Sequence, residues 1–577
     1  MSATAEQRPT AAPQAAAYRV PDERAAAYRA HGWWRDETFL DDLHRHARTH
    51  PHRTAVAARR ITESRTDTLD YAELNRLTDR FALALLELGV RRNDFVAVQL
   101  PNRWEWVPLV FAALRTGAVV VPVSPLCEGE ELRHRLALTG ARVYVTVPDA
   151  AETAVRLRRE LPALAHVLVV DGPVPEGARG FHEHVVGVER EREEGAAARL
   201  DGLATGPDDP FVVLFTSGTT GLSKGVVHSP NTVHSAVRGY VDAFGAGDDW
   251  VAAVSTPLVH YSGFAQGVLG SVLLGGTVAF QDVRRDDALL DLVERYGATL
   301  LYGPPATLAD VVASQRTRHR DTRTLRHVVI GSAPVLPELA DAVAATLGAR
   351  AHSLWGMSEN GPVTTTRPED PDGWASRSNG RPVDAMEVRV ETSGALGDDG
   401  VGRLKVRGAS LALGYLGRPE AFTAELDADG WFDTGDLARD DGRGGIRVLG
   451  RARDAIVRDG RVAPVAELEA LVGSHPDAVE AALVGVGPQG GGPDGPDGSV
   501  GPDGSVGPGG IIAVVAGRDG RLPTLEDVRA RITAAGHDTR FLPDRLEAVP
   551  ALPKTLTGKV RKAELRSRFA PVQAPTG

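Results

Sequence analysis

Apolar residues in the first 380 positions alternate between two kinds of pattern. RLTDRFALALLELGV (76–90) places them at helical spacing and ends beside a glycine, whereas DFVAVQL (94–100) contains a short apolar run. WVPLVFAALRTG and AVVVPVSP repeat this pair directly afterwards. Short apolar runs predict buried strands, and their alternation with helices predicts a mainly parallel sheet covered by helices. The pattern therefore predicts an α/β fold for this part of the chain.

The pattern of apolar and polar residues changes twice towards the C-terminus. After about residue 380 it becomes short strands and turns, as in VRVETSG, GRLKVRG and GGIRVLG, which predict a small barrel-like β subdomain. A short α+β unit follows, interrupted at 487–510 by a Gly-, Pro- and Asp-rich segment that predicts a flexible surface insertion. We expect a flexible tail with a short helix over 1–32, a large N-terminal domain over 33–452, and a small mobile C-terminal lid domain over 453–577.

Composition narrows the class of protein. The 577 residues exceed one ordinary core, and a net charge of −11 without any basic block argues against nucleic acid as a partner. The single cysteine, Cys127, excludes disulfides within the chain and zinc sites built on several cysteines. No signal-peptide core and no apolar run near the roughly 20 residues of a membrane span is present. These features predict a soluble cytoplasmic protein without a membrane partner, and they leave the oligomeric state open.

Lysine is unusually rare in this chain. The 65 basic residues include five lysines, namely Lys224, Lys405, Lys554, Lys559 and Lys562. Lysine is a compact, mobile point charge, whereas arginine is a planar fork. A site that must reach one phosphate oxygen and then withdraw favours lysine. Lys224 and Lys559 are therefore the candidates, and we interpret Lys554 and Lys562 as ordinary surface cations.

One of these lysines closes the segment TSGTTGLSKG (216–225), which directly follows the apolar run FVVLF. Glycines let backbone amides approach an anion closely, hydroxyl groups add donors, and the lysine adds a full charge. The segment therefore predicts a phosphate-binding loop, although its spacing differs from the Walker pattern. A solvated linker is the less favoured interpretation, because linkers do not follow a buried strand directly.

Four further motifs follow this loop in order: WGMSEN (355–360), WFDTGDLA (431–438), GRARDAIVRDG (450–460) and PKTLTGK (553–559). Together the five resemble the motifs of the adenylate-forming superfamily, which contains acyl-CoA synthetases, peptide-synthetase adenylation domains and luciferases. The resemblance extends from residue 33 to about 567. Ser223 stands where proline is commoner, and Ser358 stands where threonine is usual.

The resemblance implies a two-step reaction. A carboxylate attacks the α-phosphate of MgATP to give an acyl-adenylate and pyrophosphate, and the thiol of coenzyme A then displaces AMP. It implies ATP and Mg²⁺ as cofactors, coenzyme A as co-substrate and a small-molecule carboxylic acid as substrate.

The resemblance also assigns site residues. Lys559, Lys224 and Ser358 would be catalytic, and Lys559 would reach both the α-phosphate and the substrate carboxylate, where a cation lowers the barrier most. Glu359 would bind Mg²⁺, Asp454 would be the hinge of the small domain, and Gly460 would line the thiol tunnel. The phosphate-binding set is Thr216, Ser217, Gly218, Thr219, Thr220, Gly221 and Lys224. The adenine and ribose set is Gly331, Ser332, Ala333, Pro334, Trp355, Gly356, Met357, Asp436 and Arg451.

The acyl pocket is predicted from two stretches. YRAHGWWRDETFLDDL (28–43) is similar to the branch that activates aryl and alicyclic acids, such as cyclohexanecarboxylate-type CoA ligases. His260 in TPLVHYSGF (256–264) matches an aromatic position of the acyl channel. Gly263, Gly267 and Gly331 leave space, which predicts a roomy apolar pocket and a bulky, alicyclic or aromatic acid.

Departures from the family pattern keep alternatives open. RDGRV (458–462) has Arg461 and Val462 where relatives carry an acidic residue and an amide, and GRL (402–404) has arginine where Gly-Glu-Leu is usual. The chain could perform one half-reaction only, or deliver its acyl group to the phosphopantetheine of an acyl carrier protein. A degenerate, non-enzymatic nucleotide-binding module is a third interpretation. It is disfavoured because Lys224, Glu359, Asp436, Arg451 and Lys559 are all present.

Overall fold

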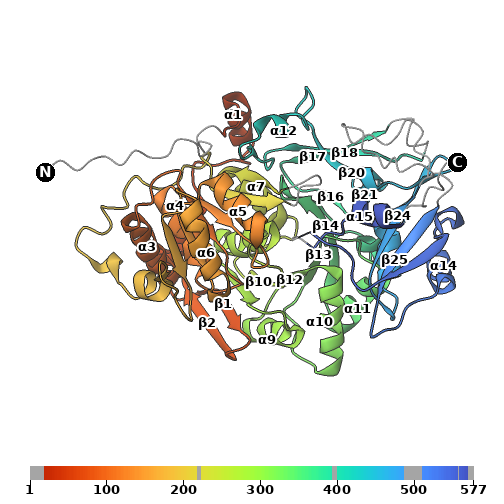
Figure 1. The fold of residues 1–577 in the computed structure, drawn as a ribbon, viewed down its shortest axis with the longest axis horizontal. Coiled ribbons are helices and arrows are strands. Elements are labelled where there is room, and N and C mark those ends of the chain that lie inside the picture. The colour runs from red at the N-terminus through yellow and green to blue at the C-terminus, as the bar shows by residue number, and fades with distance from the viewer. Residues whose placement is uncertain (1–17, 217–221, 393–398, 487–509, 556–557, 570–577) are drawn as a thin grey trace.

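A computed structural model describes residues 18–216, 222–392, 399–486, 510–555 and 558–569. Over these residues the chain forms two large sheets covered by helices, a smaller antiparallel sheet and a C-terminal α+β unit (Figure 1). The large sheets and their helices fill the left and centre of Figure 1, and the C-terminal elements, in blue, lie at the right. The predicted α/β fold class is confirmed.

The first large sheet carries the strands that flank the predicted phosphate loop. Its central strands pair in parallel, and β9 and β19 add to one end in antiparallel pairing. The central strands are buried along their length, which explains their continuous apolar sequences. Its order over the described residues is β19 (Gly414–Tyr415), β9 (Lys224–His228), β8 (Val212–Thr216), β4 (Val119–Pro122), β3 (Phe95–Val98), β5 (Val143–Thr146), β6 (His166–Val169) and β7 (Arg179–Gly180).

The second large sheet is also parallel at its centre, with antiparallel strands at both ends. Two of its strands, β13 and β14, end at motifs predicted to contact the nucleotide. Its order over the described residues is β16 (Arg381–Pro382), β15 (Gly361–Thr365), β14 (Arg350–Met357), β13 (His327–Ile330), β12 (Leu300–Gly303), β10 (Val251–Val254), β11 (Thr277–Gln281), β1 (Thr54–Arg60) and β2 (Arg65–Asp70).

Helices connect and cover the strands of both sheets. Most of the pattern at 76–90 lies in α3, which ends at Glu87. The pattern WVPLVFAALRTG forms α4, which is capped by Gly117 with φ 73°. In chain order the helices of this part are α1 (Asp22–Ala30), α2 (Phe39–Thr49), α3 (Tyr71–Glu87), α4 (Trp106–Thr116), α5 (Gly129–Thr139), α6 (Pro148–Glu160), η2 (His182–Val186), η3 (Arg190–Arg192), α7 (Pro230–Asp242), η4 (Ser262–Leu269), α8 (Gly270–Leu274), α9 (Asp286–Tyr296), α10 (Pro305–Thr317), α11 (Pro337–Leu347), η5 (Trp374–Ser376) and α12 (Pro419–Thr423).

Helix α7 links the phosphate-loop strand to the core. Ser229 caps the helix, since its side chain accepts a hydrogen bond from the backbone N–H of Thr232, and Pro230 occupies the first turn. The apolar face of the helix, Val233, Val237 and Val241, is buried. It belongs to one continuous apolar cluster that includes residues of both large sheets. The two sheets are therefore held in a fixed relation to each other.

The short strands after residue 380 form the small β subdomain. Its described strands make an antiparallel sheet in the order β17 (Met386–Thr392), β18 (Gly402–Gly408), β20 (Phe432–Asp440) and β21 (Ile446–Arg451). This sheet lies between the large sheets and the C-terminal unit in Figure 1. It places the WFDTGDLA motif on β20 and the start of GRARDAIVRDG on β21.

The C-terminal unit combines a short hairpin, a sheet and helices. Its described elements are η7 (Ala452–Asp454), β22 (Val457–Arg458), β23 (Arg461–Val462), α13 (Val465–Gly473), β24 (Ala478–Gly485), β25 (Ile511–Gly517), α14 (Leu525–Ala534), η8 (Thr539–Phe541), β26 (Arg545–Val549) and α15 (Lys562–Phe569). An ion pair of 3.0 Å between Arg447 and Glu467 joins β21 to α13. The domain boundary at 453 stays a prediction, and the predicted insertion at 487–510 lies outside the described residues apart from Gly510.

Among the helices of the described ranges, none has the length and apolar character needed to cross a bilayer.

Candidate active site

The two ends of the predicted phosphate loop are fixed by the pairing of β8 with β9. Thr216 and Lys224 are register partners at the end of this antiparallel pair. Ser217, Gly218, Thr219, Thr220 and Gly221, predicted to bind phosphate, lie outside the described residues. The sheet therefore positions the lysine of the motif at the strand edge, independently of the loop that precedes it.

Ser223, the departure from the usual proline, is anchored to α5. Its side-chain hydroxyl donates to Glu131, and its carbonyl lies 3.0 Å from Nε2 of His134. Glu131 also accepts a hydrogen bond of 2.8 Å from Arg135. Burial would raise the pKa of Glu131, but the hydrogen bonds from Ser223 and Arg135 hold it below the ordinary value. A proline could not donate this bond, so the serine gives the loop an additional anchor.

Lys224 and Glu359 are brought together around Tyr415. Nζ of Lys224 lies 4.6 Å from the centre of the Tyr415 ring, and the Tyr415 hydroxyl donates a 2.9 Å hydrogen bond to Oε1 of Glu359. Glu359 is 6% exposed. Its carboxylate is a hard oxygen donor of the kind that Mg²⁺ prefers, so the residue fits the predicted metal role.

The segment that carries Ser358 and Glu359 is held from two sides. It forms the turn between β14 and β15, where Nε2 of His228 donates a 2.7 Å hydrogen bond to the carbonyl of Ser358. The N–H of Ala412 donates a 2.7 Å bond to the carbonyl of Glu359. Burial lowers the pKa of His228 to about 4, so its ring is neutral at physiological pH. The half-buried Ser358 therefore sits on a fixed backbone.

Trp355, Asp436 and Arg451 form one connected group. The indole N–H of Trp355 donates to Oδ2 of Asp436 at 3.1 Å, and Nε of Arg451 lies 3.1 Å from Oδ1. Burial raises the pKa of Asp436 above the ordinary aspartate range, and Arg451 and Trp355 oppose this rise. Arg451 also donates to the carbonyl of Thr434. The predicted ribose-binding carboxylate is thus held in one orientation.

Lys559 belongs to the C-terminal unit, and its charge lowers the pKa of Asp436. Desolvation by the surrounding protein lowers the pKa of Lys559, as does Arg451, whereas Glu359 and Asp436 raise it. The residue keeps a solvent-exposed surface. These electrostatic effects link the lysine of PKTLTGK to Glu359, Asp436 and Arg451, and its catalytic role stays a prediction.

The segment Gly331–Pro334 directly follows β13, at the carboxyl end of a parallel strand. Ser332 has φ 73°, a left-handed conformation that is uncommon for a non-glycine residue. Backbone strain of this kind concentrates at functional sites. Gly356 and Met357 lie at the end of β14, next to this segment in the sheet.

The packing at three glycines contradicts the reasoning that they leave space for a bulky acid. A Cβ atom at Gly263 would lie 2.3 Å from the carbonyl oxygen of Pro257, and one at Gly267 would lie 2.8 Å from Val254. A Cβ at Gly331 would lie 2.6 Å from the Tyr302 hydroxyl. These glycines permit close packing of buried chain and do not open a cavity. The acyl-pocket assignment itself stays a prediction.

His260 lies in sequence between Pro257 and Gly263, the two residues that are in close contact, and it is half-buried. Burial lowers its pKa, and Arg135 and Lys559 add to this effect. The role of His260 in the acyl channel stays a prediction.

Asp454 and Gly460 lie in the first part of the C-terminal unit. Oδ1 of Asp454 accepts a 2.8 Å hydrogen bond from Arg566 on α15. Asp459 and Gly460, with φ 52° and 69°, form the two-residue turn between β22 and β23. Among the described residues, no atom other than those of its chain neighbours lies within 4 Å of a Cβ placed on Gly460. The structure therefore places both residues near the start of the unit, and their hinge and tunnel roles stay predictions.

Arg403, another departure from the family pattern, is accommodated by an ion pair. Nε and Nη2 of Arg403 lie 3.1 and 2.9 Å from Oδ2 of Asp433 on the neighbouring strand. The change therefore keeps a charge pair beside the WFDTGDLA motif.

The sequence analysis missed Tyr415 and His228. Both lie outside the quoted motifs, and their partners are distant in sequence. His228 could have been noticed as a polar residue at the end of the apolar strand that follows the phosphate loop. Tyr415 carries no comparable signal, because only the pairing of β19 with β9 places it beside Lys224.

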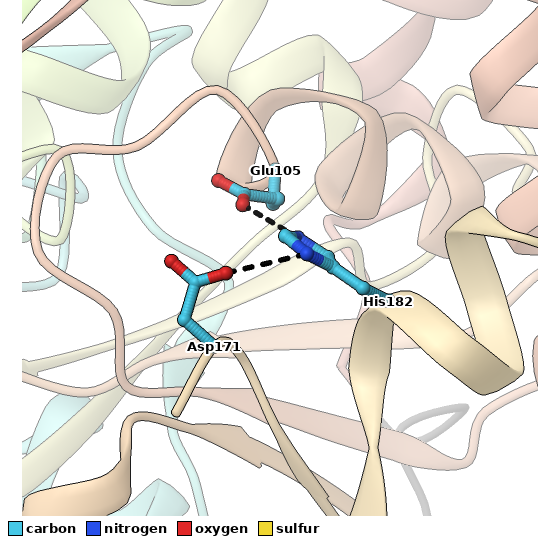
Figure 2. A group of neighbouring side chains, drawn as sticks. All are labelled: Glu105, Asp171 and His182. Atoms are coloured by element: carbon cyan, nitrogen blue, oxygen red, sulfur yellow. Dashed lines mark hydrogen bonds and ion pairs between the residues drawn. The ribbon is translucent and has the colours of Figure 1, made fainter. Parts of the chain in front are cut away.

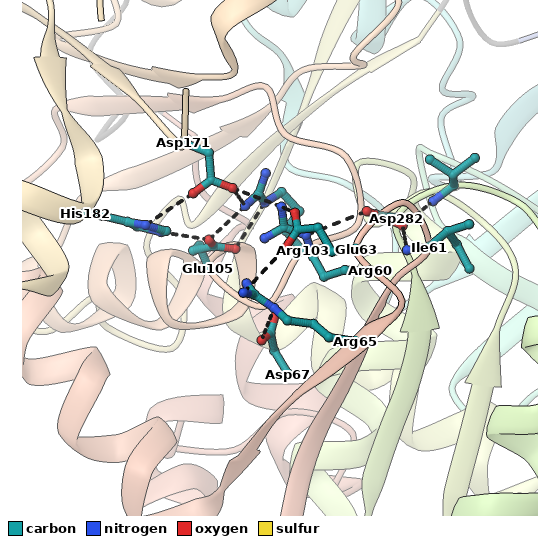
Figure 3. Close-up of polar contacts among 11 residues, drawn as sticks. Arg60, Ile61, Glu63, Arg65, Asp67, Arg103, Glu105, Asp171, His182 and Asp282 are labelled. Atoms are coloured by element: carbon teal, nitrogen blue, oxygen red, sulfur yellow. Dashed lines mark hydrogen bonds and ion pairs between the residues drawn. The ribbon is translucent and has the colours of Figure 1, made fainter. Parts of the chain in front are cut away.

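A further polar cluster joins Glu105, Asp171 and His182, which lie beside α4, β6 and η2 (Figure 2). The two ring nitrogens of His182 lie 2.9 Å from Glu105 and 3.2 Å from Asp171. These are ligand types for a cation, but Arg103 contacts both carboxylates and Arg60 lies 3.0 Å from Asp171 (Figure 3). The guanidinium groups already neutralise the carboxylates. We therefore interpret the cluster as a structural ion-pair network.

Comparison with known proteins gives consistent matches over most of the chain. The model of the AMP-binding enzyme family matches residues 43–416. Triostin synthetase I from Streptomyces triostinicus is 33% identical, over 95% of this chain and 97% of that protein. A salicylyl-CoA synthase / salicylate adenylyltransferase from a Streptomyces species is 31% identical, over 95% and 96%. The anthranilate CoA ligase AuaEII, solved in complex with anthranoyl-AMP, has the same fold, with a TM-score of 0.77 and 21% identity over 92% of this chain and 97% of that chain.

Proposed function

The chain belongs to the AMP-binding enzyme family and is an AMP-forming acid–thiol ligase, and from this premise we propose that its substrate is a ring-containing carboxylic acid. The acid is activated with ATP to an acyl-adenylate and pyrophosphate. The thiol of coenzyme A then attacks the mixed anhydride and AMP leaves. The observation that carries the proposal is the pair of contact groups at the strand ends, in which Tyr415 contacts Lys224 and Glu359, and Asp436 contacts Trp355 and Arg451.

In the proposed adenylation step, the nucleotide lies across the ends of β13, β14 and β20. Asp436 accepts hydrogen bonds from the ribose hydroxyls, which requires its ionised form. Arg451 and Trp355 keep that carboxylate oriented. Glu359 would hold Mg²⁺, which supplies positive charge to the phosphate oxygens. Fixed groups of this kind need no rearrangement when ATP binds.

Lys224 and Lys559 supply charge at two ends of the reacting group. Lys224 contacts the outer phosphates, and Lys559 bridges the α-phosphate and the acid carboxylate. Two anions must meet there, so the Lys559 ammonium offsets their repulsion and the charge that develops as they react.

Thioester formation requires that Lys559 withdraw and that the thiol enter. We propose that the C-terminal unit rotates about Asp454, which carries the Asp459–Gly460 turn towards the thiol path. The 2.8 Å bond between Asp454 and Arg566 would hold the adenylating arrangement until that rotation. Such a movement keeps water from the reactive acyl-adenylate.

The ring-containing acid is inferred from two independent sources. The 28–43 segment resembles the branch that activates aryl and alicyclic acids. Salicylate is named as the substrate of a relative that is similar over nearly the whole chain.

A carrier protein as the acyl acceptor is the second candidate, and Arg461 and Val462 in the turn region favour it because they depart from the usual residues. The cytoplasmic location stays a prediction.

The first experiment is mass spectrometry of the products of the purified chain with MgATP, coenzyme A and a panel of aromatic, alicyclic and linear acids. Formation of an aryl or alicyclic acyl-CoA together with AMP supports the proposal. Accumulation of acyl-adenylate without thioester supports a carrier protein as acceptor. A preference for linear acids contradicts the ring-containing substrate, and the absence of any adenylate contradicts the reaction.

A pair of lysine variants tests whether Lys559 catalyses the adenylation step. Lys559→Ala should lower ATP–pyrophosphate exchange roughly 10²–10³-fold, because one positioned charge at the reacting atoms is lost. Lys554→Ala is the control, since this lysine pairs with Glu480 at the domain surface. Equal rates for Lys559→Ala and the unmodified chain would show that the catalytic assignment is wrong.

A further inference from the structure

Tyr415 contacts both charged groups that the proposed function places on the triphosphate. Its hydroxyl donates to Oε1 of Glu359 at 2.9 Å, and its ring lies 4.6 Å from Nζ of Lys224. The residue is 4% exposed. One side chain therefore serves the carboxylate through its hydroxyl and the ammonium through its ring face.

The position of Tyr415 is fixed by its surroundings. Its strand, β19, pairs with β9 so that Tyr415 is the register partner of Val226, two residues after Lys224. The Phe422 ring packs against it edge-on at 5.2 Å, and its carbonyl accepts a 3.3 Å hydrogen bond from the Tyr18 hydroxyl. Tyr415 is thus held by the fold and does not depend on ligand for its orientation.

A lysine and a glutamate in one site attract each other and would form an ion pair. Both residues are described, yet no ion pair joins Lys224 to Glu359, and each instead contacts Tyr415. The hydroxyl supplies a donor to the carboxylate, and the negative face of the ring attracts the ammonium. Neither group is neutralised by the other, so both remain able to bind the nucleotide and its cation.

We propose that Tyr415 is a positioning residue that keeps Lys224 and Glu359 apart and oriented for MgATP. This inference rests on the proposed function, because it assumes that both residues bind the triphosphate and Mg²⁺. The hydroxyl acts as an outer-shell partner of the metal ligand, and the ring acts as a platform for the lysine. Loss of outer-shell partners typically weakens metal binding by about 10–100-fold.

Two substitutions separate the two contacts. Tyr415→Phe removes the hydroxyl and keeps the ring, whereas Tyr415→Leu removes both. Tyr296→Phe is the matched control, because the Tyr296 hydroxyl is buried on α9 without a hydrogen-bond partner among the described residues. Thermal unfolding of each variant checks that the fold is retained, and Tyr415→Phe alone suffices if Tyr415→Leu does not fold.

The test measures calorimetric binding of a non-hydrolysable ATP analogue, with and without increasing Mg²⁺. We expect Tyr415→Phe to raise the Mg²⁺ concentration for half-maximal binding about tenfold, with little change in binding without Mg²⁺. Tyr415→Leu should also weaken the Mg²⁺-free binding, because Lys224 is then free to pair with Glu359. Tyr296→Phe should match the unmodified chain in both measurements.

The outcomes distinguish this inference from the proposed function. Unchanged Mg²⁺ dependence in Tyr415→Phe would overturn the positioning role. If the unmodified chain binds the MgATP analogue but forms no acyl-adenylate, the proposed reaction fails while the Tyr415 result still stands. Absence of nucleotide binding by the unmodified chain would overturn both.

Discussion

Replacing Gly263 by alanine separates two explanations of this glycine. One is that the missing side chain leaves room for a bulky acid, and the other is that it allows the start of η4 to touch the backbone of Pro257 and Leu258. A Cβ at this position would lie 2.3 Å from the Pro257 oxygen, 2.7 Å from the Pro257 carbonyl carbon and 3.0 Å from the Leu258 Cα. All three are backbone atoms, which cannot turn away as the end of a flexible side chain can.

The size of the effect follows from what must move. Ordinary contact begins near 3.4 Å, so the 257–258 backbone or the start of η4 must shift by about 1 Å. Asn102 resists this shift, because it donates a 3.0 Å hydrogen bond to the Thr256 carbonyl and accepts a 2.8 Å bond from the Leu258 N–H. Overpacking of this kind costs about 1–3 kcal/mol.

The assay combines stability with kinetics. Gly263→Ala should lower the thermal midpoint by about 1–4 °C, and it should reduce kcat/KM by similar factors for the largest and smallest acids that are accepted. Gly247→Ala is the control, since its Cβ would meet only Asp249, at 3.9 Å. Unchanged stability with a selective loss for large acids would refute the packing argument and restore the open-pocket interpretation.

Three further predictions concern charge. The lowered pKa of Lys559 means that its charge is present at low pH and is lost as the pH rises through that pKa. The kcat/KM for adenylation should therefore begin to decrease at a pH lower than the ordinary lysine pKa of about 10.4. Lys559→Arg should lose this alkaline limb in a pH–rate profile, and persistence of the limb would assign it to another group. Trp355→Phe removes a hydrogen bond to Asp436, whose pKa is already raised by burial. Calorimetry should show MgATP binding about tenfold weaker, and the loss should grow as the pH falls and Asp436 protonates. An affinity that does not depend on pH would contradict this. Glu467→Gln leaves the buried Arg447 without its charge partner, so chemical denaturation should show a loss of about 1–3 kcal/mol, and no loss would mean that the pair does not join β21 to α13.

Local sequence signals gave reliable predictions wherever the controlling interaction is short-range. The helix within 76–90, the Gly117 cap at the end of α4 and the buried strand FVAV all follow the pattern. Caps, glycine conformations and apolar periodicity involve residues a few positions apart, so the chain encodes them directly. Lys224 was a candidate from its Gly-, Ser- and Thr-rich segment, and Glu359 from the resemblance of WGMSEN to the family motif.

The sequence by itself determined the α/β class, the helix and strand positions and most candidate residues of the site. Only the tertiary structure decided that Tyr415 lies between Lys224 and Glu359, and that Gly263 fills a close contact and does not open a pocket. The sequence does not reveal that Tyr415 lies beside Lys224, because the two residues meet only through the pairing of β19 with β9. The atoms that crowd Gly263 belong to Pro257 and Leu258, which are near in sequence, but only the three-dimensional course of this turn shows that they contact the glycine.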